Sequence, residues 1–135
     1  MFVFVPMKII SWNVQGLNGV QVMQEIKILT RIHKPNMIFL LETMVNETNL
    51  LRILPTFGFG HFDYVLPHNH SGDIVVLWNN GDIHASILSK EHRAIHMLVF
   101  YNSIQKLLVI SGIMLQLNFV RKKRFGHIYL NLTLL

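Results

Sequence analysis

Two apolar stretches of the chain end in polar side chains whose types could do chemistry. Asn13 follows residues 7–12, which are predicted to form a short buried strand, and Glu42 follows the continuous apolar run Met37–Leu41. An amide or a carboxylate at the end of a buried strand is held on a rigid support, which is a common way to present a functional group. The chemistry open to the chain therefore depends on whether the fold brings Asn13 and Glu42 together.

The residues between these two stretches predict an element that would bring them together. Apolar residues at helical spacing predict a helix over residues 22–33, and Pro35 ends it because proline cannot continue the hydrogen-bond ladder. Strand, helix and strand then form a βαβ-like unit with a right-handed crossover. Parallel strands end at one edge of a sheet, so Asn13 and Glu42 would meet there. The alternative for Glu42 is a capping or surface carboxylate of a helix at residues 45–54.

The remainder of the chain predicts mostly antiparallel strands and a final helix. Short apolar runs alternate with turn residues, and the strands are expected at residues 61–66, 74–78, 83–89, 95–101 and 107–113. Apolar residues at helical spacing predict a C-terminal helix that contains Phe125, Ile128, Tyr129 and Leu132. Neither a repeat nor a linker interrupts the pattern, so residues 1–135 are expected to form a single domain of the α/β (α+β) class.

The composition is that of a folded chain without disulfides. Of its 135 residues, 51% are hydrophobic, 14% are charged and none is cysteine. The longest apolar segment, residues 107–120, is interrupted by polar residues and is shorter than the roughly 20 residues that a spanning helix needs. Residues 1–6 lack the features of a signal peptide, so the chain is not expected to be secreted; nucleus and cytoplasm both stay open. These residues are interpreted as a strand extension or a leader before a natural start at Met7.

The positive charge is concentrated at the end of the chain. The net charge is +5, and residues 92–135 hold six Lys or Arg residues and no Asp or Glu. The densest cluster is Arg121, Lys122, Lys123 and Arg124. Such a cluster suits a polyanion such as nucleic acid, although a solvated basic helix face explains it equally well.

Other polar residues carry weaker signals. His68 and His70 stand two apart in a loop, and a zinc site there is disfavoured because no third ligand is evident. Asp73 precedes an apolar strand and is interpreted as a position without a site. Trp12 and Trp78 are expected in the core rather than as stacking platforms for bases.

The residues at 7–17 (MKIISWNVQGL) and 34–43 (KPNMIFLLET) resemble the endonuclease/exonuclease/phosphatase family. The resemblance is strongest to the endonuclease domain of plant non-LTR retrotransposons, and it continues through SGDIVVLW at 71–78, LLVISGI at 107–113 and RKKRF at 121–125. It covers most of the chain. The paired Asn and Glu motifs are more specific than either motif alone.

This resemblance implies a deoxyribonuclease-I-like sandwich that hydrolyses phosphodiester bonds in DNA with Mg²⁺, which Mn²⁺ could replace. Glu42 would be the carboxylate that binds the cation, and Asn13 would orient the phosphate or a second carboxylate. Mg²⁺ needs only one or two carboxylates because it keeps several waters. The cation would polarise the phosphate and stabilise the leaving oxygen.

Departures from the family pattern predict a chain with impaired catalysis. Met114 occupies the position where the family has a tyrosine that contacts the phosphate, and a thioether cannot donate a hydrogen bond. The family's later motifs, which activate the nucleophilic water, would lie beyond residue 135, and most of the second sheet would be missing, with apolar faces left uncovered. The alternatives are a nucleic-acid-binding fragment that uses residues 121–124 and a fragment without function.

Overall fold

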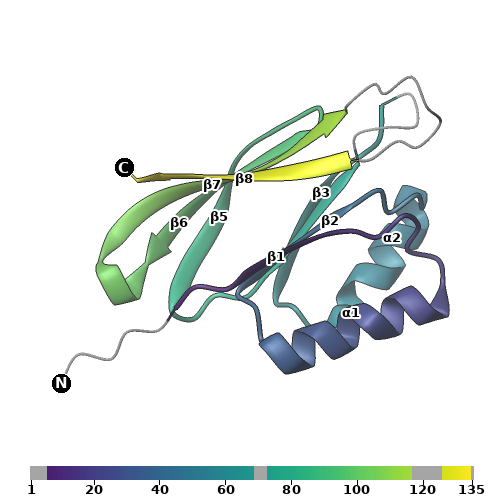
Figure 1. Cartoon of the computed structure of the whole chain (residues 1–135), viewed down its shortest axis with the longest axis horizontal. Coiled ribbons are helices and arrows are strands. Elements are labelled where there is room, and N and C mark those ends of the chain that lie inside the picture. The colour runs from purple at the N-terminus through teal and green to yellow at the C-terminus, as the bar shows by residue number, and fades with distance from the viewer. Residues whose placement is uncertain (1–5, 69–72, 117–125, 135) are drawn as a thin grey trace.

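The computed structural model describes residues 6–68, 73–116 and 126–134 (Figure 1). Two β-sheets of four strands each pack face to face, and two helices cover the outer face of the first sheet. This arrangement confirms the mixed α+β class expected from the sequence. In this part of the chain, neither helix is long and apolar enough to cross a membrane.

The first sheet has the strand order β1-β2-β4-β3. Its strands are β1 (Ile9–Asn13), β2 (Met37–Leu41), β3 (His61–Val65) and β4 (Ile74–Trp78). β1 and β2 are parallel, as the sequence predicts, whereas β4 runs antiparallel to both β2 and β3. The continuous apolar runs of β2 and β4 are buried along their whole length, because helices cover one face of the sheet and the second sheet covers the other.

The helical segments follow the two parallel strands. They are α1 (Val20–His33), α2 (Glu47–Ile53) and a 3₁₀ turn, η1 (Leu54–Phe57). α1 ends at His33. The cap residue Lys34 has a left-handed backbone and donates its N–H to the Thr30 carbonyl, and Pro35 follows as a buried residue. α2 begins after Asn46, whose side chain accepts from the Asn49 N–H and so caps the helix.

The second sheet is a meander with the order β5-β6-β7-β8. Its strands are β5 (Ile83–Glu91), β6 (Ala94–Tyr101), β7 (Lys106–Gln116) and β8 (Gly126–Leu134), and the 3₁₀ turn η2 (Asn102–Ile104) joins β6 to β7. All neighbouring pairs are antiparallel. The expectation that most of the second sheet would be missing is therefore wrong.

The expected C-terminal helix is also wrong, because residues 126–134 form strand β8. β8 pairs with β7 along its length, with Gly126 opposite Gln116 and Leu134 opposite Leu108. Ile128 and Leu132 fit a helical spacing, but with Leu130 and Leu134 they also alternate with polar or smaller residues at the period of a strand. The long unpaired edge of β7 decides between the two patterns, since pairing satisfies a whole row of backbone groups.

The core between the two sheets is closed by one tight contact. Gly112 of β7 lies against the ring of Phe39 of β2, and a Cβ atom added at Gly112 would come within 2.6 Å of that ring. Trp78 is buried in the same core, and Trp12 packs partly buried on the helix side of the first sheet. Both tryptophans are thus packing residues, as the sequence predicts.

Candidate functional site

The ends of β1 and β2 meet at one edge of the first sheet. Asn13 is level with Leu41 in the parallel register, and the Val14 N–H donates to the Leu41 carbonyl over 3.0 Å. One turn further, the Gly16 N–H donates to the Glu42 carbonyl over 2.8 Å. The backbone therefore brings Asn13 and Glu42 to the same edge, as the sequence predicts.

Asn13 uses its side chain to shape the loop that leaves β1. Its Oδ1 atom accepts from the Gln15 N–H over 3.1 Å, which closes a tight turn. The side chain is half-buried. A carbonyl oxygen has two lone pairs and the amide NH₂ has two donors, so Asn13 keeps hydrogen-bonding capacity for a ligand.

Glu42 has a backbone conformation that is unusual for its residue type. Its φ of 52° lies in the left-handed region, which costs a residue with a Cβ atom about 1–2 kcal/mol. Glu42 is half-buried and does not cap α2, because Asn46 does so. The capping alternative for Glu42 is thereby removed.

Left-handed backbone is concentrated in the two loops at this edge. Gln15 (φ 48°), Glu42 (φ 52°) and Met44 (φ 55°) are non-glycine residues with positive φ, and Gly16 (φ 107°) lies among them. The other described non-glycine residues with positive φ occupy two helix ends and the turn between β5 and β6. Strain of this kind gathers where a surrounding structure holds functional groups in place.

A buried carboxylate holds the strained loop after β2. Asp73, 7% exposed, accepts from the Thr43 hydroxyl over 2.7 Å and from the Met44 N–H over 3.1 Å, both at Oδ2. Its carbonyl oxygen also accepts from the Glu42 N–H over 3.4 Å. A buried carboxylate needs such partners, so the Asp73 bonds offset the backbone strain at residues 42–44.

Asp73 is the residue that the sequence analysis missed, since it was assigned no site. Its position directly before a fully buried strand was the available signal, because a charge entering a core requires donors. Thr43, which follows the end of the neighbouring strand, supplies one of these donors.

Met114 is a core residue in this structure. It is 4% exposed and packs between the two sheets, and its N–H donates to the Arg93 carbonyl over 2.8 Å. The structure thus uses the thioether for packing. The basic cluster Arg121–Arg124 lies outside the described residues.

The donors at the edge of the sheet suit a cation that binds few protein ligands. Among the described residues, no three or more His, Cys, Asp or Glu side chains are grouped so that they could hold a metal ion. Glu42 and Asn13 therefore offer one carboxylate and one amide, while the Asp73 carboxylate is occupied by the loop. A hard cation such as Mg²⁺ fits such a set because water completes its coordination.

Of the two histidines considered as zinc ligands, the structure describes only His68, which packs against His92. His70 lies outside the described residues, and the His68 ring packs edge-on against His92 with the ring centroids 5.2 Å apart. Desolvation, the charge of Arg93 and the nearby His68 lower the pKa of His92 below its ordinary value.

A second polar cluster links three strands of the second sheet. The His96 Nδ1 atom lies 2.6 Å from the Ser111 hydroxyl, and its Nε2 atom lies 3.1 Å from Glu91 Oε1. A hydroxyl, an imidazole and a carboxylate linked in this order can form an activated nucleophile, as in hydrolytic triads. Ser111, however, is 6% exposed in the middle of a regular strand, directly opposite His96. We assign this cluster to cross-strand stabilisation.

Comparison of the chain with protein-family models and with curated protein sequences gives no match in either case. The class of protein defined by the fold is an α+β sandwich of two four-stranded sheets, with two helices on one outer face.

Proposed function

We propose that the chain provides part of a Mg²⁺-dependent phosphodiesterase site and that the chain alone has little or no nicking activity on DNA. The observation that carries this proposal is the meeting of Asn13 and Glu42 at the ends of two parallel strands. The motifs that contain these residues resemble those of retrotransposon endonucleases, whose reaction is the nicking of DNA.

The roles of the residues follow from their chemistry. Glu42 would hold the cation, and Mn²⁺ could replace Mg²⁺ because both accept oxygen ligands. The cation, when bound, supplies charge neutralisation at the phosphate. The Asn13 amide would donate to a phosphate oxygen. Asp73 would keep Glu42 in position through its bonds to Thr43 and Met44.

One observation supports impaired catalysis. Met114 is packed in the core as a thioether, so it cannot donate the hydrogen bond that a tyrosine would donate at this position.

A plasmid-nicking assay with Mg²⁺ tests the proposal. We expect at most a trace of nicked product from the chain and no further loss in Glu42→Ala. Binding of Mn²⁺, followed separately by calorimetry, should be weak in the chain and lost in Glu42→Ala. Glu25→Ala is the matched control, because Glu25 is exposed on α1 and accepts from the nearby Gln21 of the same helix. Robust nicking that depends on Glu42 would refute impaired catalysis, and equal Mn²⁺ binding in both variants would refute the cation site.

The charge distribution supports a second candidate, a nucleic-acid-binding fragment without catalysis. Residues 92–135 carry six Lys or Arg residues and no carboxylate. If the four cations at 121–124 all contact phosphates, the logarithm of the affinity for duplex DNA should fall with the logarithm of salt at a slope of about −3 to −4. Replacing all four with glutamine should flatten that slope. Salt-insensitive or absent binding would exclude this candidate.

The third candidate is a fragment without function that folds poorly. The described core argues against it, because 28 hydrophobic residues are buried. Cooperative thermal unfolding of the purified chain is the expected result for the two functional candidates, and a broad transition is expected for the third.

A further inference from the structure

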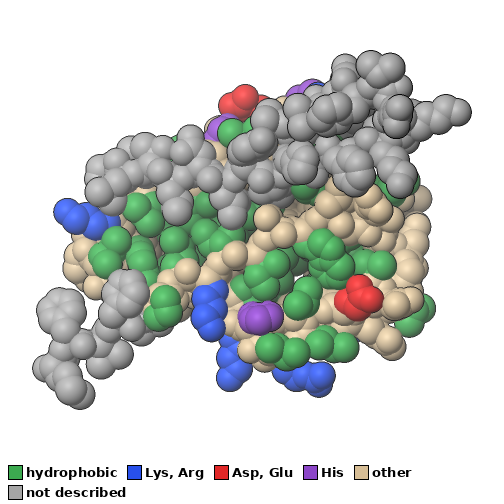
Figure 2. Space-filling model, viewed as in Figure 1, with side chains coloured by type: hydrophobic (Ala, Val, Ile, Leu, Met, Phe, Trp, Pro, Cys, Tyr) green, Lys and Arg blue, Asp and Glu red, His purple; other side chains and the backbone are tan. Residues whose placement is uncertain are grey.

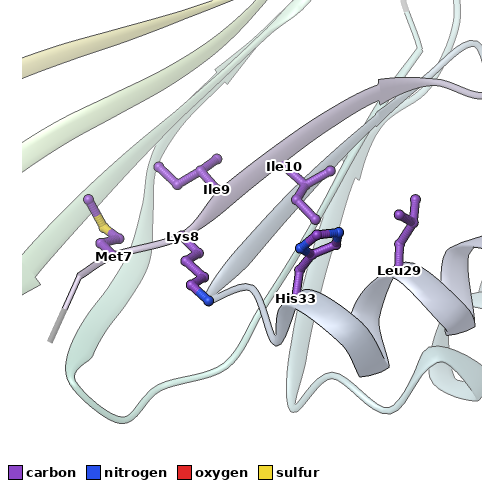
Figure 3. A pocket seen from close by; sticks show the side chains of 6 residues that line it. All are labelled: Met7, Lys8, Ile9, Ile10, Leu29 and His33. Carbon is purple, nitrogen blue, oxygen red and sulfur yellow. The ribbon is translucent and has the colours of Figure 1, made fainter.

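A groove follows the outer edge of β1 beside the end of α1 (Figure 3). Its volume is about 520 Å³, and it is lined by Met7, Lys8, Ile9, Ile10, Leu29 and His33. Met7 and Lys8 directly precede β1, and Ile9 and Ile10 are its first two residues, whose side chains point to opposite faces of the sheet. Ile9 packs toward the core between the sheets, whereas Ile10 packs toward the helices. The groove therefore runs along the edge of β1 rather than over one face.

Among the residues that the structure describes, no strand pairs with the backbone of β1 along this edge. β1 is the terminal strand of its sheet, and the Lys8 carbonyl accepts from the Met37 N–H of β2. Neighbouring residues of a strand direct their backbone groups to opposite sides, so those of Ile9 and Ser11 face away from β2. β8 lies close to β1, but in the described residues it pairs only with β7. Open backbone groups of this kind are a template for an added strand.

The groove combines apolar side chains with one lysine and one histidine. Ile10 and Leu29 lie beside His33 between strand and helix, and Lys8 extends from the start of the strand at the same end (Figure 3). Figure 2 shows hydrophobic side chains across this face, with Lys or Arg side chains at its lower border, a His side chain among the hydrophobic ones and an Asp or Glu side chain farther to the right. None of the lining residues is acidic.

The charge selects the kind of partner. The chain carries a net charge of +5, and Lys8 and His33 border the groove itself. A second copy of the chain would bring the same net positive charge and the same lysine to the interface, which disfavours self-association. An acidic segment would instead be attracted both by the whole chain and by the groove.

We propose that the edge of β1 and its groove bind an extended acidic peptide segment of another protein. The segment adds a strand to β1 through the backbone groups of Ile9 and Ser11. Apolar side chains of the segment enter the groove beside Ile10 and Leu29, and its carboxylates face Lys8 and His33. This interaction is independent of the cation site proposed at the far end of β1.

The probe for this proposal is a short, end-blocked, fluorescein-labelled peptide of alternating valine and glutamate. A sister peptide with lysine in place of glutamate is the control. Fluorescence anisotropy should show at least about tenfold tighter binding of the glutamate peptide, which corresponds to one or two charge contacts. Equal binding of the two peptides would overturn the proposed charge selection and with it the acidic partner.

Two variants test the edge and the charge separately. Ser11→Pro removes an exposed N–H that faces away from β2, and proline is tolerated on an edge strand at such a position. We expect it to weaken binding of the glutamate peptide about tenfold or more. Lys8→Glu should weaken binding similarly, whereas Lys27→Glu, exposed on α1 outside the groove, should change it much less.

Three results would contradict the proposal. Ser11→Pro that is folded by circular dichroism and binds with full affinity would exclude strand addition. If Ser11→Pro does not fold, equal effects of Lys8→Glu and Lys27→Glu would exclude the groove. Self-association of the unmodified chain in sedimentation equilibrium, abolished by Lys8→Glu or Ser11→Pro, would identify the occupant as a second copy.

Discussion

The two edges of the first sheet differ in how they are protected. At the β3 edge, Lys90 of β5 reaches across to Asp63 with its Nζ atom 2.8 Å from Oδ1, and it also lies 5.9 Å from the centre of the Tyr64 ring. The Tyr64 hydroxyl donates to Glu47 of α2. The β1 edge, in contrast, has an open backbone and an apolar groove.

This difference shows where the fold leaves room for partners. A lysine at a sheet edge hinders the addition of another strand, and at the β3 edge it also links the two sheets. The β1 edge has no such link in the described residues. Both proposed sites involve β1: the cation site lies where β1 and β2 end, and the peptide groove lies along the side of β1. The protected edge contributes to stability, and the open edge is available for binding.

The largest expected effect is a loss of stability when the strained loop after β2 loses the carboxylate that holds it. Asp73→Ala leaves the buried Thr43 hydroxyl and the part-buried Met44 N–H without their acceptor. Because an unsatisfied buried group costs about 1–3 kcal/mol, the free energy of unfolding should fall by about 2–4 kcal/mol. Denaturant unfolding measures this change. Asp82→Ala, which loses one bond from the Ser103 hydroxyl, is the control and should lose less; an equal loss would contradict the role of Asp73.

The next largest effect is expected in the core between the two sheets, where Gly112 lies against Phe39. It tests whether the sheets stay packed when this contact is disturbed and the ion pair at the β3 edge is kept. Gly112→Ala places a Cβ atom 2.6 Å from the Phe39 ring, and overpacking of this kind costs about 1–3 kcal/mol. The same unfolding measurement applies. Gly81→Ala is the control, because nothing lies within 4 Å of its added Cβ atom. If Gly112→Ala is as stable as the parent chain, the two sheets can move apart at this contact at little cost in free energy.

A smaller effect compares one lysine from each edge. Lys90→Ala should lower the free energy of unfolding by about 0–1 kcal/mol, since its ion pair with Asp63 is partly exposed and screened by water. Lys8→Ala should leave stability unchanged, because its side chain borders the open groove. If Lys8→Ala is the more destabilising of the two, the β1 edge contributes more to the fold than its structure indicates.

The smallest expected effect is a change in the pKa of Tyr64 at the β3 edge. The hydrogen bond to Glu47, with desolvation and the charges of Glu47 and Asp63, raises the pKa of Tyr64 above its ordinary value. The folded state thus holds the Tyr64 proton more tightly than the unfolded state. The resulting stabilisation is present below the ordinary pKa and is lost as pH rises through the folded one. Glu47→Gln should lower the pKa of Tyr64 in an absorbance titration; an unchanged pKa would contradict the link to α2.

Sequence patterns predicted the parts of the fold that local chemistry determines. β2 and β4 have the predicted bounds because their continuous apolar runs are buried on both faces. The convergence of Asn13 and Glu42 followed from the parallel βαβ arrangement. β8 was predicted as a helix because its spacing satisfies both periods, and only pairing with β7 decides between them. The Asp73 bonds could not be predicted because residues thirty positions apart make them.

The most direct test of the proposed cation site is the broadening of backbone amide signals by Mn²⁺ in the isotope-labelled chain. The account predicts selective broadening around Asn13 and at residues 41–44, with loss of that pattern in Glu42→Ala and its retention in Glu25→Ala. Broadening that is absent, spread evenly over the surface, or unchanged in Glu42→Ala would contradict a cation site at this edge of the sheet.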